Sequence, residues 1–161
     1  MKLSRFTTNL ALCVLLISEI SIAKEIGDER IELVGDIYEL ITALKKADII
    51  VEFKNPPIQG SYGMFNLKKK KIWIAPITQE MGIFKSTLIH EAVHAAQSCK
   101  SGNIEPIGWK LKADNAVEIS IRSILYRKYP SEKFDIEREA FLMQGQPDAI
   151  AKIKEILAKH C

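Results

Sequence analysis

The stretch from Thr87 to Ala96 constrains the fold more than any other part of the chain. It reads Thr-Leu-Ile-His-Glu-Ala-Val-His-Ala-Ala, and Glu91 is its one charged residue at neutral pH. Such an uncharged frame is what a buried helix requires, because a surface helix carries a polar face. The rest of the chain must therefore cover this helix. A length of 161 residues with 47% hydrophobic residues suits a single globular domain with a packed core.

Apolar spacing and turn residues predict an α+β arrangement around this helix. The expected elements are a helix over 28–46, a short β-branched run over 49–53, strands over 62–67 and 71–75 around a lysine turn, and helices from residue 84 onward with breaks at 100–103, 129–130 and 145–147. We therefore expect a small antiparallel sheet, essentially a hairpin, packed on a mostly helical domain.

The first residues have the layout of a secretory signal peptide. Lys2 and Arg5 precede the apolar run 10–17, and small residues occupy the −3 and −1 positions of a cleavage site after Ala23. Glu19 ends the apolar run well short of the roughly 20 residues that a membrane-spanning helix needs. The sequence therefore predicts a signal peptide over 1–23, a single mature domain over 24–161, and a secreted or periplasmic protein without a stable membrane anchor. An uncleaved amphipathic helix or short anchor is the alternative.

Removal of the signal peptide leaves two of the three cysteines. Cys13 is lost, and Cys99 and Cys161 remain. An even number of cysteines in an oxidising compartment favours a disulfide between them. Two independent thiols are the alternative, since connectivity cannot be read from a sequence.

The buried helix also contains a metal-binding pattern. His90 and His94 are four residues apart, so a helix presents both imidazoles to one point, where they can bind zinc at roughly 2.0–2.1 Å. Glu91 is rotated about 100° from His90, which places it beside the metal, where it can act as a general base. The alternative is a helix with two histidines at the edge of the core. The third histidine of the chain, His160, is expected to face solvent near the C-terminus.

This His-Glu-x-x-His segment in an uncharged frame resembles the zinc metallopeptidases called zincins. The resemblance implies a sheet before the motif helix whose edge strand pairs with an extended peptide substrate. Either 72–74 or 62–65 could supply that edge. The metzincin subclass is excluded, because Gln97 and Lys100 stand where it has glycine and a third histidine. The resemblance is therefore to gluzincins, whose third ligand is a glutamate on a later helix.

Three downstream glutamates are candidates for that ligand. Glu118 is spaced for a solvated ion pair with Arg122. Glu137 instead lies in an aromatic stripe, where a carboxylate is costly unless it is paired or bound to metal. Glu139 shares a more solvated face and is the alternative ligand. The order of Glu137, Glu139 and the following alanine also resembles the E-x-E-A pattern of some gluzincin-like peptidases, in which the first glutamate is the ligand.

The resemblance implies an exported zinc-dependent metallopeptidase that acts on peptides or proteins. Two other functions remain open: a non-catalytic secreted metal-binding domain, and a zinc amidase acting on a cell-wall polymer. The net charge of +3 gives no reason to expect a nucleic-acid partner, and no pattern indicates an oligomeric state. Tyr62, Tyr126 and Tyr129 are equal candidates to donate a hydrogen bond to an oxyanion.

Overall fold

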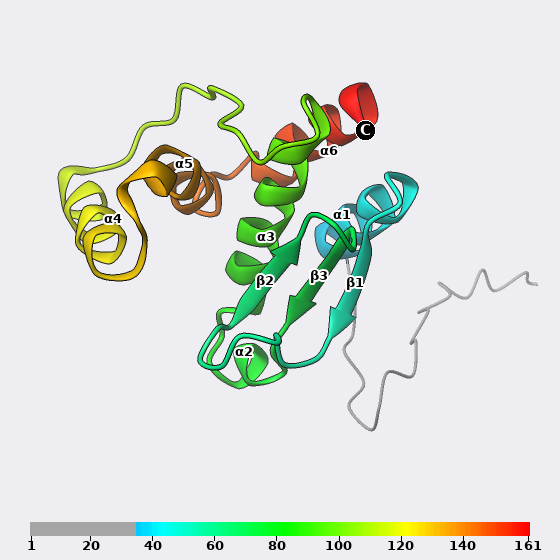
Figure 1. The fold of residues 1–161 in the computed structure, drawn as a ribbon, viewed down its shortest axis with the longest axis horizontal. Helices are drawn as coiled ribbons and strands as arrows, with labels where there is room; N and C mark the ends of the chain where they lie inside the picture. Colours follow the sequence, from blue (N-terminus) through cyan, green and yellow to red (C-terminus); the bar gives the residue numbers. More distant parts are fainter. Residues whose placement is uncertain (1–34) are drawn as a thin grey trace, which may run out of the picture.

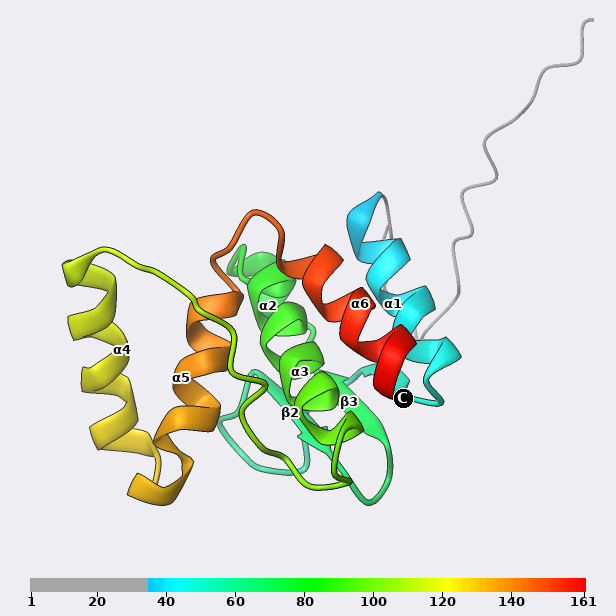
Figure 2. The same ribbon diagram turned by 90° about the horizontal axis from the view of Figure 1, so that it is seen from above.

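Five helices lie side by side in the computed structural model, which describes residues 35–161. Figure 2 shows them in the order α4, α5, α3, α6, α1, which differs from their order in the sequence. Their bounds are α1 (Asp36–Lys46), α3 (Phe84–Cys99), α4 (Asn115–Lys128), α5 (Phe134–Met143) and α6 (Ala149–His160). Two short elements, α2 (Ile77–Glu80) and the 3-10 helix η1 (Ser131–Lys133), precede α3 and α5.

A three-stranded sheet lies against α1 and α3 (Figure 1). Its strands are β1 (Ile50–Phe53), β2 (Gly63–Asn66) and β3 (Lys71–Ile74), in the order β1-β3-β2. The predicted hairpin is confirmed, because β2 and β3 pair antiparallel. The sheet as a whole is mixed, because β1 joins β3 in parallel and extends the hairpin by one strand. Two consecutive prolines, Pro56 and Pro57, follow β1 and oppose a tight hairpin there. The chain crosses to the far side of β3 before β2 begins.

The main core lies between the sheet and the helices α1, α3 and α6, which we call the inner helices. Its fully buried side chains include Leu40, Ile72, Leu88 and Ile153. Every residue of α3 from Leu88 to Ser98 is buried. This confirms the expectation of a helix covered on all sides, and explains why its sequence has so little charge.

The helices α4 and α5, which we call the outer pair, extend beyond the β2 edge of the sheet (Figure 2). A smaller apolar cluster holds them together, formed by Ile121 and Leu125 of α4 and Leu142 of α5. On its other side α5 contributes Ala140 and Met143 to the main core. The short helix α5 therefore links two apolar clusters.

The first helix and the segment after α3 have other bounds than predicted. The structure begins the first helix at Asp36, and residues 28–34 lie outside the described part, as do the signal peptide 1–23 and its alternative. The expected break at 100–103 is too short, because the non-helical segment runs to Asp114. Pro106 and the positive φ of Gly108, +88°, oppose a helix there.

Among residues 35–161 no helix combines the length and apolar character needed to span a membrane.

Candidate metal centre

Two histidines of α3 and one glutamate of α5 lie close together where the inner helices meet the outer pair. The Nε2 atoms of His90 and His94 lie 3.2 Å apart. The Oε2 atom of Glu137 lies 3.3 Å from the first and 3.4 Å from the second. All three residues are buried, and each directs a potential ligand atom to the same point. The structure thus brings together His90, His94 and Glu137, the three residues predicted from the sequence as metal ligands.

Glu137 is the acidic member of this cluster. Within the described part of the chain, the buried Oε2 atom of Glu137 has no hydrogen-bond partner. Burial by itself would raise the pKa of Glu137, but the adjacent imidazoles of His90 and His94 lower it to about 2. A buried carboxylate oxygen without a hydrogen-bond partner, facing two imidazole nitrogens, fits a divalent cation with tetrahedral N and O ligands such as zinc.

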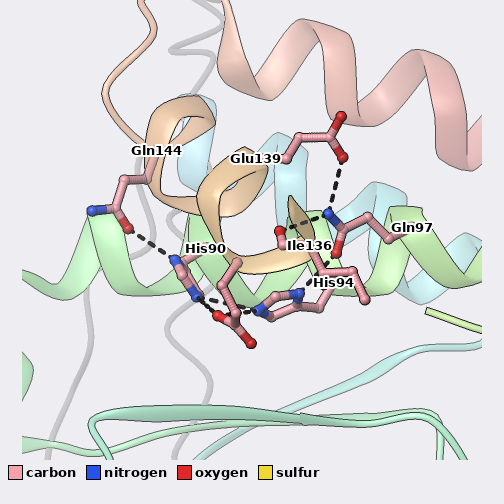
Figure 3. A network of polar contacts seen from close by, with 7 residues as sticks. His90, His94, Gln97, Ile136, Glu139 and Gln144 are labelled. Carbon is pink, nitrogen blue, oxygen red and sulfur yellow. Dashed lines mark hydrogen bonds and ion pairs between the residues drawn. The ribbon is translucent and has the colours of Figure 1, made fainter. Parts of the chain in front are cut away.

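The Nδ1 atoms of both imidazoles also have hydrogen-bond partners. Nδ1 of His94 lies 2.8 Å from Oε1 of Gln97, and Nδ1 of His90 lies 3.2 Å from Oε1 of Gln144. Figure 3 shows these two contacts on opposite sides of the facing imidazoles. The ring of Phe141 packs edge-on against His90, with ring centroids 4.6 Å apart. Both rings are therefore held with Nε2 toward the centre.

Glu91 lies beside this cluster, under strand β2. Burial raises the pKa of the Glu91 carboxyl, although the positive potential of His90 and His94 opposes the shift. The backbone N–H of Phe65 opposes the shift as well, and lowers the pKa of this carboxyl by a smaller amount. A Cβ atom at Gly63 would lie only 2.7 Å from Oε1 of Glu91, so this position of β2 requires glycine.

Strand β2 is the edge of the sheet that faces the cluster. The N–H of Ala75 donates to the carbonyl of Tyr62, 2.8 Å away, which makes these residues a hydrogen-bonded pair. Because such pairs alternate along an antiparallel ladder, the amides of Gly63 and Phe65 point away from β3. Of the two candidate edges, 72–74 is excluded because β3 is the central strand. The segment 62–65 forms the edge.

Glu139, the alternative ligand, points away from the cluster. Its carboxylate accepts hydrogen bonds from three consecutive backbone N–H groups, those of Ile107, Gly108 and Trp109, at 2.8, 2.7 and 3.0 Å. The expectation of a more solvated setting was wrong, since Glu139 is 7% exposed. The long segment between α3 and α4 covers Glu139. The spacing of residues along α5 alone could not predict this contact.

Glu118 is an ion-pair residue, as expected, but its partner is different. Its carboxylate accepts hydrogen bonds from Nε and Nη2 of Arg138 in α5, at 3.2 and 2.5 Å. The expected pairing with Arg122 in the same helix was wrong. Packing of α4 against α5 brings the Arg138 guanidinium into bidentate reach, a geometry that matches a carboxylate well.

The three candidate tyrosines differ in burial. Tyr62 and Tyr126 are 48% and 69% exposed. Tyr129 is half-buried, and its phenol is within hydrogen-bonding reach of Glu137. Burial, together with the negative charges of Glu137 and Glu91, raises the pKa of Tyr129. Tyr129 therefore keeps its proton and is the candidate tyrosine that can donate a hydrogen bond at this site.

The predicted disulfide is present in the structure. It joins Cys99, the last residue of α3, to Cys161, which follows α6. The bond fastens the ends of two inner helices to each other. His160 beside it is exposed, as expected for a residue outside the candidate site.

Sequence reasoning missed two residues of the site. Gln97 was considered only as a departure from the metzincin pattern, although its position three residues after His94 places both side chains on one helical face. Gly63 carried a weaker signal, since a glycine inside a strand marks a close approach of another group. Gln97 contacts His94 of the cluster, and Gly63 leaves room for Glu91 beside it.

Comparison with known proteins supplies a family but no activity. Residues 61–161 match the family described as Domain of unknown function (DUF8637). This range contains β2, β3, the motif helix and both outer helices, and so the whole candidate site. No curated protein and no solved structure matches the chain. Since the match spans more than half of its residues, the chain belongs to the family Domain of unknown function (DUF8637).

Proposed function

We propose that this protein is an exported zinc-dependent metallopeptidase. One observation carries the proposal: His90, His94 and Glu137 direct three ligand atoms to one buried point, with Glu91 beside them. Two imidazoles and one carboxylate leave a fourth position open, which is the arrangement of catalytic rather than structural zinc sites. A purely structural site would have no use for the neighbouring base.

The zinc ion, when bound, would act as a Lewis acid and make a water molecule acidic enough to react near neutral pH. Glu91 would accept the proton of this water and later give it to the leaving amine. Burial raises the pKa of the Glu91 carboxyl, which makes it a better proton acceptor than an exposed glutamate. Tyr129 would donate a hydrogen bond to the oxyanion of the substrate.

Strand β2 supplies a means of binding an extended peptide. The outward-facing amides of Gly63 and Phe65 offer main-chain hydrogen bonds on the side of the sheet that faces Glu91. A peptide added to this edge would run past the zinc ligands. Its affinity would come from main-chain pairing and its specificity from side-chain pockets.

Export is part of the proposal. The disulfide between Cys99 and Cys161 supports it, because disulfides persist mainly in oxidising compartments. Mass spectrometry of the protein recovered outside the cytosol would test cleavage after Ala23. An N-terminus at Lys24 is the expected result, and retention of residues 1–23 would contradict it.

The test of function combines metal analysis with an assay. Purified mature protein should contain one zinc per chain, and should cleave casein or a peptide library in a manner abolished by a chelator and restored by zinc. Glu91→Gln keeps the shape of the side chain and should retain the zinc while activity falls by about 100-fold to 10,000-fold, the range for loss of a general base. His94→Ala should lose both.

The other outcomes identify the other functions. Stoichiometric zinc without cleavage of peptides or cell-wall polymers would indicate a non-catalytic metal-binding domain. Release of fragments from a cell-wall polymer, with peptides left intact, would indicate a zinc amidase. Retention of stoichiometric zinc by His94→Ala would contradict the metal site itself.

A further inference from the structure

The side-chain amide of Gln97 lies between a metal-ligand candidate and a carboxylate on another helix. Its Oε1 atom is 2.8 Å from Nδ1 of His94. Its Nε2 atom is 2.9 Å from Oε2 of Glu139 and 3.0 Å from the carbonyl oxygen of Ile136. Figure 3 shows this chain of contacts running from the facing imidazoles to Glu139. Gln97 itself is 1% exposed.

The partners of the amide fix which way it points. A carboxylate and a carbonyl can only accept hydrogen bonds, so the NH2 group of Gln97 must face Glu139 and Ile136. The amide oxygen then faces His94, and because it can only accept, Nδ1 of His94 must carry the hydrogen. The lone pair of the neutral imidazole is thereby placed on Nε2, the atom directed at the metal cluster.

The carboxylate that orients Gln97 is itself fixed. Three consecutive backbone N–H groups, from Ile107 to Trp109, donate to the two oxygens of Glu139. With the amide of Gln97, Glu139 has four donors in a nearly solvent-free position. It therefore couples the segment between α3 and α4 to the imidazole of His94.

The arrangement at His90 is different. Oε1 of Gln144 is 3.2 Å from Nδ1 of His90, and the hydrogen bonds among the described residues give the Gln144 side chain no second partner. Gln144 is half-buried at the end of α5. Within residues 35–161, no second hydrogen bond fixes which end of this amide faces His90, so Gln144 does not select a tautomer as Gln97 does.

We infer that Gln97 and Glu139 form a positioning relay that holds His94 in the tautomer required for metal binding. Gln97 is the positioning residue, and Glu139 sets its orientation. This inference rests on the metal site of the proposed function. It assigns a role to the second glutamate of the E-x-E segment that is distinct from metal ligation.

The test uses the mature protein, zinc alone as the ligand, and a chromophoric chelator as competitor. Gln97→Met removes both polar ends of the amide with little change in volume, and Gln144→Met is the matched control at the other histidine. Zinc affinity should fall by about 10-fold to 100-fold in Gln97→Met, as for other partners of ligating histidines, and by less in Gln144→Met. NMR of the imidazole nitrogens in metal-free protein, at a pH where the rings are neutral, should show the Nδ1–H form of His94 in wild type and its loss in Gln97→Met.

A charge exchange separates positioning from simple packing. Gln97→Glu alone sets two carboxylates against each other and should weaken zinc binding and destabilise the protein. The double variant Gln97→Glu with Glu139→Gln restores a donor and an acceptor between the two side chains, and should recover part of the stability and zinc affinity. The Nδ1–H form of His94 should persist in both variants, because a glutamate at position 97 can only accept a hydrogen bond. This double variant also serves if Gln97→Met does not fold.

Equal zinc affinities in Gln97→Met and Gln144→Met, or an unchanged His94 tautomer in Gln97→Met, would overturn the relay. So would loss of the Nδ1–H form in Gln97→Glu or in the double variant. Failure of wild type to bind zinc would contradict the proposed function instead. The NMR measurement needs no metal, so it would still report whether Gln97 selects the tautomer.

Discussion

The inner helices and the outer pair contribute unequally to the same site. The inner helices share the main core with the sheet, and a disulfide fastens α3 to the end of α6. The outer pair has only a small cluster of its own, around Ile121 and Leu125. Two ligand candidates come from the inner region, and the third, Glu137, comes from the outer one. Metal binding would therefore add a further link between α3 and α5, which already share the main core.

The largest effect should come from removing the outer region's ligand. Glu137→Ala should lower zinc affinity by more than about 100-fold, because even partners that only orient ligands account for 10–100-fold. Chelator competition measures the affinity, and circular dichroism should show unchanged secondary-structure content. An affinity within a few-fold of wild type would mean that the outer pair does not contribute to the site.

The disulfide should stabilise the inner helices. In the chain-entropy model, a loop closed between residues 62 positions apart contributes about 4 kcal/mol to the free energy of unfolding. The double variant Cys99→Ser with Cys161→Ser should lose most of this in chemical denaturation. Wild type in reductant is the control and should match it. Two free thiols at these positions in the exported protein would contradict the bond.

Two isoleucines compare the apolar clusters directly. Ile153 is fully buried in the main core, and Ile121 is 5% exposed between α4 and α5. Ile153→Ala should cost about 3–4 kcal/mol, within the range for such truncations in cores. Ile121→Ala should cost less, because few buried neighbours surround it. Hydrogen exchange should show faster opening of α4 only in Ile121→Ala. Equal costs would contradict the distinction between the regions.

The smallest effect concerns the ion pair within the outer pair. Glu118→Gln breaks the contact with Arg138 and should cost less than about 1 kcal/mol, as partly exposed pairs do. Arg122→Gln is the matched control, and should change the free energy of unfolding even less. A larger effect at Arg122 would favour the pairing expected from helical spacing alone.

Local patterns in the sequence were sufficient where one element determines the geometry. The four-residue spacing of His90 and His94 places both imidazoles together on any helix, and the uncharged frame required that helix to be buried. The stripe of α5 placed Glu137 on the face that meets the histidines, although it did not show that Glu139 is equally buried. The hairpin also followed from local signals, because alternation and a lysine turn are enough to specify one.

The tertiary structure decided what depends on partners distant in the sequence. Two features of the sheet depend on how the chain crosses it. They are the parallel pairing of β1 with β3, and the position of β2 at the edge with β3 in the centre. Glu118 pairs with Arg138 because two helices pack together, and Glu139 is buried because a segment about 30 residues away supplies its donors. Spacing along one helix determines which residues share a face, but only packing determines what that face meets.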